Sequence, residues 1–179
     1  MNTSTKIGLW ILIITVVGTA ALWMIGGKQG EYLSSLTIDA PPEAVFPFLV
    51  EPVHLKKWKS GLIEVAKYEK PEENDLLGPP LAQKTERIIS INGKDVRFKD
   101  QVIRYDLNKS LSVQSTNAMK VSTEIFKLAP VGDKTQLSYR ITVDNRGWGR
   151  ILGPLQSDPT KSRIDTDIRQ LKDLVEATN

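Results

Sequence analysis

The sequence predicts an α+β protein in which a long carboxy-terminal helix packs on a curved antiparallel sheet, preceded by one transmembrane helix. Three observations support this fold class. An uncharged apolar run fills residues 7–26, strand-like runs separated by turn signals fill most of 63–143, and an amphipathic helical stripe closes the chain. The order of these elements carries more weight than any one of them.

The run at 7–26 predicts a membrane anchor. About twenty residues of helix rise about 30 Å, which matches the hydrocarbon core of a bilayer. Trp10 and Trp23 lie near its two ends, where aromatic rings favour the membrane interface, and Lys6 and Lys28 flank it. We therefore expect the lipid bilayer to be a partner of the chain through these residues.

A cleaved signal peptide, cut near Gly18-Thr19-Ala20, is the alternative interpretation, although the apolar run is longer than a usual signal-peptide core. Lys6 and the amino terminus together outweigh Lys28, which favours a cytoplasmic amino terminus and an extracytoplasmic domain. This single-pass organisation comprises a tail at 1–6, the anchor at 7–26, a linker at 27–30 and one domain at 31–179.

Composition excludes several kinds of site. The chain has no cysteine, which removes disulfides, thiolate metal sites and a cysteine nucleophile. His54 is the single histidine, so a multi-histidine metal site is excluded and a histidine-based triad fits poorly. A net charge of +3, scattered along the chain, does not indicate a nucleic-acid-binding surface. We predict no metal, no cofactor and no nucleic-acid partner.

The domain opens with a strand at 32–38, followed by two short helices. Pro41-Pro42 suits a helix start because proline at the first turn loses no useful donor. Apolar residues follow at helical spacing up to Leu49, and Pro47 should shorten or bend this helix. Pro52 opens the second helix, with Leu55 and Trp58 facing inward.

The middle of the chain reads as strands joined by turns. A loop rich in proline, acidic residues and glycine fills 70–80, and Asn92-Gly93 is a strong hairpin signal. Clear alternation at 136–143 places Leu137 and its apolar neighbours on one face. Strands are predicted at 63–68, 82–91, 95–105, 111–114, 120–128 and 135–143.

The chain ends in a long amphipathic helix. Asp158-Pro159 has the form of a cap followed by proline at the first turn. The residues of the apolar stripe are Ile164, Ile168, Leu171 and Val175. Most charged residues lie off that stripe, namely Asp165, Asp167, Arg169, Lys172 and Asp173.

This order of elements resembles the START-like superfamily, also called SRPBCC or polyketide-cyclase/dehydrase-like, whose members have the helix-grip fold. The likeness spans about 31–177. Its opening part includes Ile38, 40–46, Leu49, Pro52, Trp58 and Gly61, and its closing part includes Thr135, Leu137, Tyr139, 147–149, Leu152, Pro154 and the helix at 171–172. The proline at position 47 departs from the family pattern.

The resemblance implies a cavity between the sheet and the long helix, binding an apolar or amphipathic molecule such as a lipid, isoprenoid or polyketide. The family supplies no shared catalytic residue, so none is predicted. The candidate wall residues, for which ordinary core packing is the alternative, are Phe48, Trp58, Phe98, Phe126, Tyr139, Ile141, Trp148, Leu152, Ile164 and Ile168. Trp148 would lie near the cavity mouth.

Charges on the strands, including Arg87, are ordinarily surface residues. Asp100 and Arg104 are candidates for the cavity because they share parity with Val96 and Phe98, and Glu124 is a third. The leading hypothesis is a membrane-anchored binding protein that is not an enzyme. The alternatives are a cyclase, dehydratase or hydrolase using the same cavity, and a protein-interaction module of the same fold.

One basic segment has two interpretations. Lys56, Lys57 and Lys59 surround Trp58 shortly after the first helix of the domain. A solvated helix end is the ordinary interpretation of such a run. The functional interpretation is that Lys56, Trp58 and Lys59 contact anionic lipid headgroups near the anchor.

Overall fold

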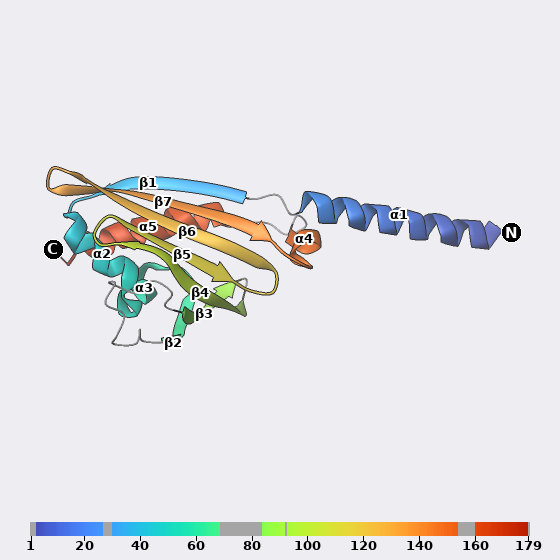
Figure 1. Cartoon of the computed structure of the whole chain (residues 1–179), viewed down its shortest axis with the longest axis horizontal. Helices are drawn as coiled ribbons and strands as arrows, with labels where there is room; N and C mark the ends of the chain where they lie inside the picture. Colours follow the sequence, from blue (N-terminus) through green and yellow to red (C-terminus); the bar gives the residue numbers. More distant parts are fainter. Residues whose placement is uncertain (1–2, 27–29, 69–83, 92, 154–159, 179) are drawn as a thin grey trace.

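A computed structural model describes residues 3–26, 30–68, 84–91, 93–153 and 160–178 (Figure 1). The described part of the chain contains one seven-stranded sheet with helices packed against it. Several predictions fall on residues outside these ranges: the loop at 70–80, the cap at 158–159, Asn92 of the hairpin turn and most of the linker at 27–30.

The sheet is antiparallel throughout, in the order β1-β7-β6-β5-β4-β3-β2. From β2 to β7, each strand pairs with the next one along the chain. The first strand, β1, pairs instead with the last, β7, so β1 and β2 form the two edges of the sheet. The strands are β1 Gly30–Ile38, β2 Leu62–Tyr68, β3 Lys84–Ile91, β4 Lys94–Asp106, β5 Ser110–Thr116, β6 Lys120–Val131 and β7 Lys134–Asn145.

Two short helices connect β1 to β2. Helix α2 (Pro42–Val50) starts with proline in its first turn and continues through Pro47, so that proline does not end it. The helix ends at Glu51, whose extended backbone is the conformation favoured before a proline. Pro52 then starts α3 (Pro52–Trp58), as predicted.

Helix α5 (Thr160–Glu176) packs its apolar stripe against the concave side of the sheet, together with α2 and α3 (Figure 1). All four predicted stripe residues are buried: Ile164, Ile168, Leu171 and Val175. Asp167, predicted to lie off the stripe, is 2% exposed, because its carboxylate accepts the backbone N–H of Ser60 at 2.9 Å from the end of α3. The predicted helix-grip architecture is therefore confirmed.

Helix α1 (Thr3–Ile25) extends from the domain and is long and apolar enough to cross a membrane. It meets the domain at α4 (Gly149–Leu152), a single helical turn for which the sequence predicted no element. The amide of Asn145 donates to the carbonyl of Gly26 at 3.1 Å, and the guanidinium of Arg150 lies 4.6 Å from the ring centre of Trp23. A Cβ on Gly26 would lie 1.6 Å from the carbonyl oxygen of Arg150, so this close approach requires glycine.

Candidate functional site

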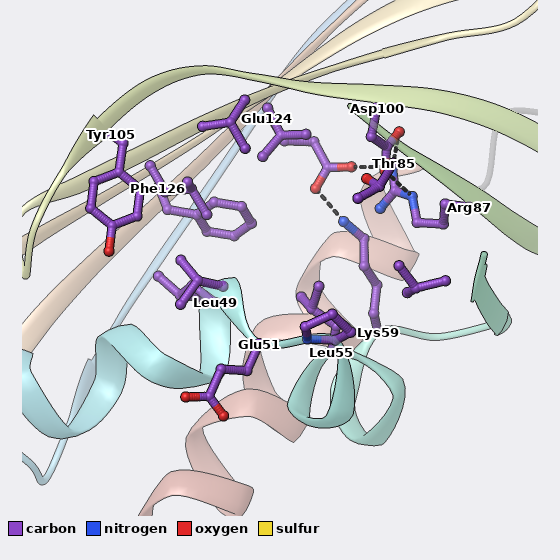
Figure 2. Close-up of a pocket in the computed structure, with 16 residues that line it drawn as sticks. Leu49, Glu51, Leu55, Lys59, Thr85, Arg87, Asp100, Tyr105, Glu124 and Phe126 are labelled. Carbon is purple, nitrogen blue, oxygen red and sulfur yellow. Dashed lines mark hydrogen bonds and ion pairs between the residues drawn. The ribbon is translucent and has the colours of Figure 1, made fainter. Parts of the chain in front are cut away.

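A pocket of about 290 Å³ lies between the α2–α3 pair and the strands β2 to β6 (Figure 2). Most of its wall is aliphatic or aromatic, and Glu51, half exposed between the two helices, marks where the pocket reaches solvent. The lining residues are Leu49, Val50, Glu51, Pro52, Leu55, Lys59, Val65, Thr85, Arg87, Asp100, Val102, Tyr105, Leu111, Val113, Glu124 and Phe126.

Buried charges form one end of this pocket, and we call Lys59, Arg87, Asp100 and Glu124 the charged cluster. All four residues are less than 8% exposed. The sheet register brings three of them together. Asp100 pairs with Thr85 on one side and with Ser115 on the other, and Ser115 pairs with Ser122. Arg87 is two residues beyond Thr85 and Glu124 two residues beyond Ser122, each on the same face. Lys59 reaches the cluster from the residue that ends α3.

Ion pairs connect the whole cluster. Nζ of Lys59 donates to Oε2 of Glu124, and Nη2 of Arg87 donates to Oε1 of the same carboxylate at 3.1 Å. Nε of Arg87 lies 2.7 Å from Oδ2 of Asp100, and Nη2 also contacts Ser115 Oγ at 2.8 Å. Arg87 therefore bridges the two carboxylates, and Glu124 receives both cations. Figure 2 shows Lys59 and Arg87 approaching Glu124 from different sides.

Tyr139 completes the surroundings of Glu124. Its hydroxyl donates to Oε2 at 2.9 Å, and its ring stacks on Phe126 with the centroids 4.3 Å apart. Phe126 in turn meets the edge of Trp58, whose indole N–H donates to the carbonyl of Phe48 at 2.8 Å. The polar end of the pocket is thus held by packed aromatic rings, which limits how far the charged groups can move.

The electrostatics follow from burial and pairing. Burial alone would raise the pKa of the Glu124 carboxyl, but Lys59 and Arg87 and the hydrogen bonds it accepts hold that pKa well below its ordinary value. Burial lowers the pKa of Lys59, and the charge of Arg87 lowers it further. Burial raises the pKa of Asp100, although Arg87 opposes the rise. Two cations and two carboxylates leave the ionised cluster without net charge.

The structure brings together two of the three predicted polar groups. Asp100 and Glu124 are buried and line the pocket. Arg104 is exposed, contrary to the parity argument, because a bulge between Val102 and Arg104 shifts the register of β4 against β5. After the bulge, odd-numbered residues of β4 face the pocket instead of even-numbered ones, so Tyr105 lines the pocket in place of Arg104.

The predicted wall residues divide into three groups. Phe126 lines the pocket. Seven further predicted wall residues are buried but pack in the hydrophobic core. Phe98 packs with Leu62 and Ile89 in a smaller cluster. The members of the main core are Phe48, Trp58, Tyr139, Ile141, Ile164 and Ile168. Trp148, 73% exposed, and Leu152 lie on the surface at α4, beside α1 rather than at the pocket.

The headgroup-binding prediction for Lys56, Trp58 and Lys59 is wrong for two of its three members. Trp58 is fully buried and Lys59 is 6% exposed, while Lys56 remains on the surface. The sequence reasoning thus missed Lys59 and Arg87 as parts of the pocket. Arg87 shares parity with Ile89 and Thr85, which indicated an inward position, whereas the facing of Lys59 depends on where α3 ends.

No group of metal-ligating side chains is found in the ranges that the structure describes. The chemistry that the pocket offers comes from its charged cluster. Two cationic donors, two carboxylates and a tyrosine hydroxyl lie beside an apolar wall, a combination suited to orienting a molecule with one polar end.

Comparison with known proteins agrees with this architecture. The sequence model of the family described as polyketide cyclase / dehydrase and lipid transport matches residues 31–176. The chain belongs to this family. Comparison with curated proteins gives no match. The family match covers the sheet, its helices and the whole pocket, and it leaves α1 outside.

Solved structures show the same fold for this member of the polyketide cyclase / dehydrase and lipid transport family. The protein TTHA0849 from Thermus thermophilus is 16% identical, with a TM-score of 0.65 over 84% of this chain and 99% of its own. Major latex-like protein 151 from Panax ginseng is 11% identical, with a TM-score of 0.60 over 84% and 97%. The di-domain ARO/CYC protein BexL from the BE-7585A biosynthetic pathway is 15% identical, with a TM-score of 0.60 over 83% of this chain and 49% of its own. At these identities the likeness establishes the fold.

Proposed function

We propose that this protein is a membrane-anchored binding protein for a small amphipathic molecule, held in the pocket with its polar end at the charged cluster. The observation that carries the proposal is the pocket itself, which combines an apolar wall with buried charges at one end. Helix α1 supplies the anchor by its length and apolar composition, and the balance of flanking lysines favours an extracytoplasmic domain.

The volume of the pocket bounds the ligand. About 290 Å³ corresponds to about ten non-hydrogen atoms at roughly 30 Å³ each, the volume of one water molecule in the liquid. A whole phospholipid or sterol exceeds this. A medium-length acyl or isoprenyl segment, or a single substituted ring, fits it. Each buried methylene contributes about 0.8 kcal/mol, so the apolar wall supplies most of the affinity.

The position of the pocket indicates how a ligand reaches it. Among the lining residues, Glu51 between α2 and α3 has a half-exposed side chain, which favours an opening of the pocket at these helices. Figure 1 shows these helices at the end of the domain away from α1. A ligand would therefore enter from the aqueous side of the domain rather than directly from the bilayer that holds α1.

Extraction of bound molecules tests the binding proposal. The full chain would be purified into lipid nanodiscs, and the solvent extract compared by mass spectrometry with that of empty nanodiscs of the same composition. We expect an enriched small amphipathic species at a stoichiometry close to one. An extract identical to that of empty nanodiscs, together with no uptake of added medium-chain probes, would contradict the proposal.

The anchor is tested separately. We expect the full chain to stay in the membrane pellet after carbonate extraction, and a chain lacking residues 1–26 to be soluble. The intact mass of the protein isolated from membranes distinguishes the anchor from a signal peptide, because cleavage near residues 18–20 would remove most of α1.

The charged cluster also favours a second candidate function, an enzyme of cyclase, dehydratase or hydrolase type. Asp100 faces the pocket, where burial raises the pKa of its carboxyl although Arg87 opposes the rise, and a carboxyl in a pocket can exchange a proton with a bound molecule. The test is whether the extracted molecule, returned to the purified protein, is converted to a product that differs in mass or in chromatographic retention, because a ring closure without loss of water leaves the mass unchanged. Unchanged mass and retention over many hours favour binding alone.

A further inference from the structure

We propose that the pocket selects a ligand whose polar end is an uncharged hydrogen-bond acceptor, a carbonyl oxygen above all, held by Lys59 and Arg87. This inference rests on the proposed binding function and narrows it to a chemical class. Two properties of the charged cluster support it: its cations have unused hydrogen-bond donors whereas its carboxylate oxygens are already paired, and the ionised cluster carries no net charge.

The two cations have unused donors. The ammonium of Lys59 has three N–H groups, and Oε2 of Glu124 is the acceptor found for it among the described residues. Nη2 of Arg87 donates to Glu124 and to Ser115. Nε is buried and lies 2.7 Å from Oδ2 of Asp100 but has no acceptor in hydrogen-bonding geometry, and no described residue accepts from Nη1. Both side chains line the pocket. Buried N–H groups without an acceptor are unfavourable, so a ligand that supplies one is favoured.

The carboxylates, in contrast, have no unused oxygen, because each oxygen already has a cationic partner. Oε1 of Glu124 receives Arg87, and Oε2 receives both Lys59 and Tyr139. Oδ1 and Oδ2 of Asp100 both lie against Arg87. A ligand donor would have to compete with these ion pairs. The cluster therefore offers donors to a ligand and few acceptors.

Charge distinguishes a neutral acceptor from an anionic one. The ionised cluster carries no net charge, since Lys59 and Arg87 balance Asp100 and Glu124. A carboxylate head would leave one negative charge without compensation, with the buried carboxyl of Asp167 close by on α5. An unpaired buried charge costs far more than an unpaired neutral group. A ketone, ester, amide or quinone oxygen fills the donors without adding charge.

Four probes of equal size test this selection: methyl heptyl ketone, nonanol, nonylamine and octanoate. Their affinities for the full chain in nanodiscs would be measured by calorimetry at neutral pH, after subtracting binding to empty nanodiscs. We expect the ketone to bind most tightly, and nonylamine and octanoate each to bind at least about tenfold more weakly than the ketone. The affinity of nonanol should lie between that of the ketone and those of the two charged probes. Equal affinity for all four would overturn this inference but leave the binding function intact, whereas no binding of any probe would overturn both.

Removing the ammonium group of Lys59 provides a second test of this selection. Lys59→Met should abolish most of the preference for the ketone over nonanol and nonylamine, while Lys57→Met, on the exposed side of the same helix, should leave the order unchanged. A preference that survives Lys59→Met undiminished would exclude Lys59 as the group that holds the ligand. If Lys59→Met does not fold, the order of the four probes in the unaltered protein still decides the proposal.

Discussion

Replacing Glu124 with glutamine should strongly destabilise the domain. Glu124 is 4% exposed and is the common partner of Lys59 and Arg87. At the 3.1 Å separation of Nη2 and Oε1, a charge pair at an effective dielectric of about 20 interacts with about 5 kcal/mol. Glutamine keeps an acceptor oxygen and the shape but removes that charge, leaving two buried cations facing one carboxylate.

The response of Lys59 limits the loss. A buried ammonium without its counter-charge can release its proton, and lowering a lysine pKa from about 10.4 to neutral pH costs about 5 kcal/mol. We therefore expect Glu124→Gln to lower the free energy of unfolding by about 3–5 kcal/mol, the usual cost of breaking a buried pair. That is a large share of the roughly 5–15 kcal/mol that stabilises a typical domain.

Hydrogen exchange of β6 amides in the nanodisc-bound chain would measure this loss, because the best-protected amides report global opening. Glu31→Gln is the matched control. Glu31 pairs with Arg140 at 3.0 Å on the surface, and we expect its replacement to cost less than about 1 kcal/mol. The double variant Glu124→Gln with Lys59→Met should recover part of the loss. If Glu124→Gln cost no more than Glu31→Gln, the cluster would not be a tightly coupled buried network and our reasoning would be refuted.

Three further predictions concern pH, the pocket and the anchor contact. Because pairing holds the pKa of Glu124 well below its unfolded value, its contribution to stability is fully present above about pH 5 and declines progressively as the pH falls below the unfolded pKa toward the much lower folded one, so the stability gap between the unaltered protein and Glu124→Gln should narrow steadily below about pH 4. Val113→Phe narrows the pocket by four non-hydrogen atoms and should weaken binding of methyl heptyl ketone strongly, whereas Val131→Phe, on an exposed hairpin, should leave binding unchanged. Gly26→Ala should force α1 away from Arg150, speeding exchange of α4 amides while β6 protection is unchanged; equal effects at both sites would contradict a local contact.

Most of the fold could be predicted from local patterns. The alternation in β7, the prolines at the starts of α2 and α3 and the apolar stripe of α5 each depend on neighbouring residues, and each appears in the structure as expected. The extra turn α4 is the exception. It depends on a tertiary contact, since a Cβ on Gly149 would lie 2.0 Å from the carbonyl oxygen of Met119.

The site was only partly predictable because it depends on tertiary geometry. Asp100 was found by strand parity, but Arg104 was assigned to the same face since no local signal reveals the bulge between them. Lys59 follows a buried tryptophan at the end of a helix, and its inward direction is set by the position of Glu124, distant in sequence. Burying a lysine is costly without a partner, so the sequence alone favours the surface.

The bulge in β4 has a consequence for how this strand can vary. Asp100 and Tyr105 both face the pocket although their positions differ by an odd number, and Ile103, exposed to solvent, is the additional residue that makes this arrangement possible. A strand without Ile103 would alternate regularly and still direct both side chains inward. Ile103 is thus dispensable for the pocket's chemistry but not for its shape, because a bulge bends a strand and increases its twist. A single deletion in a relative would therefore change the curvature of the sheet around the pocket, with every pocket-lining residue retained.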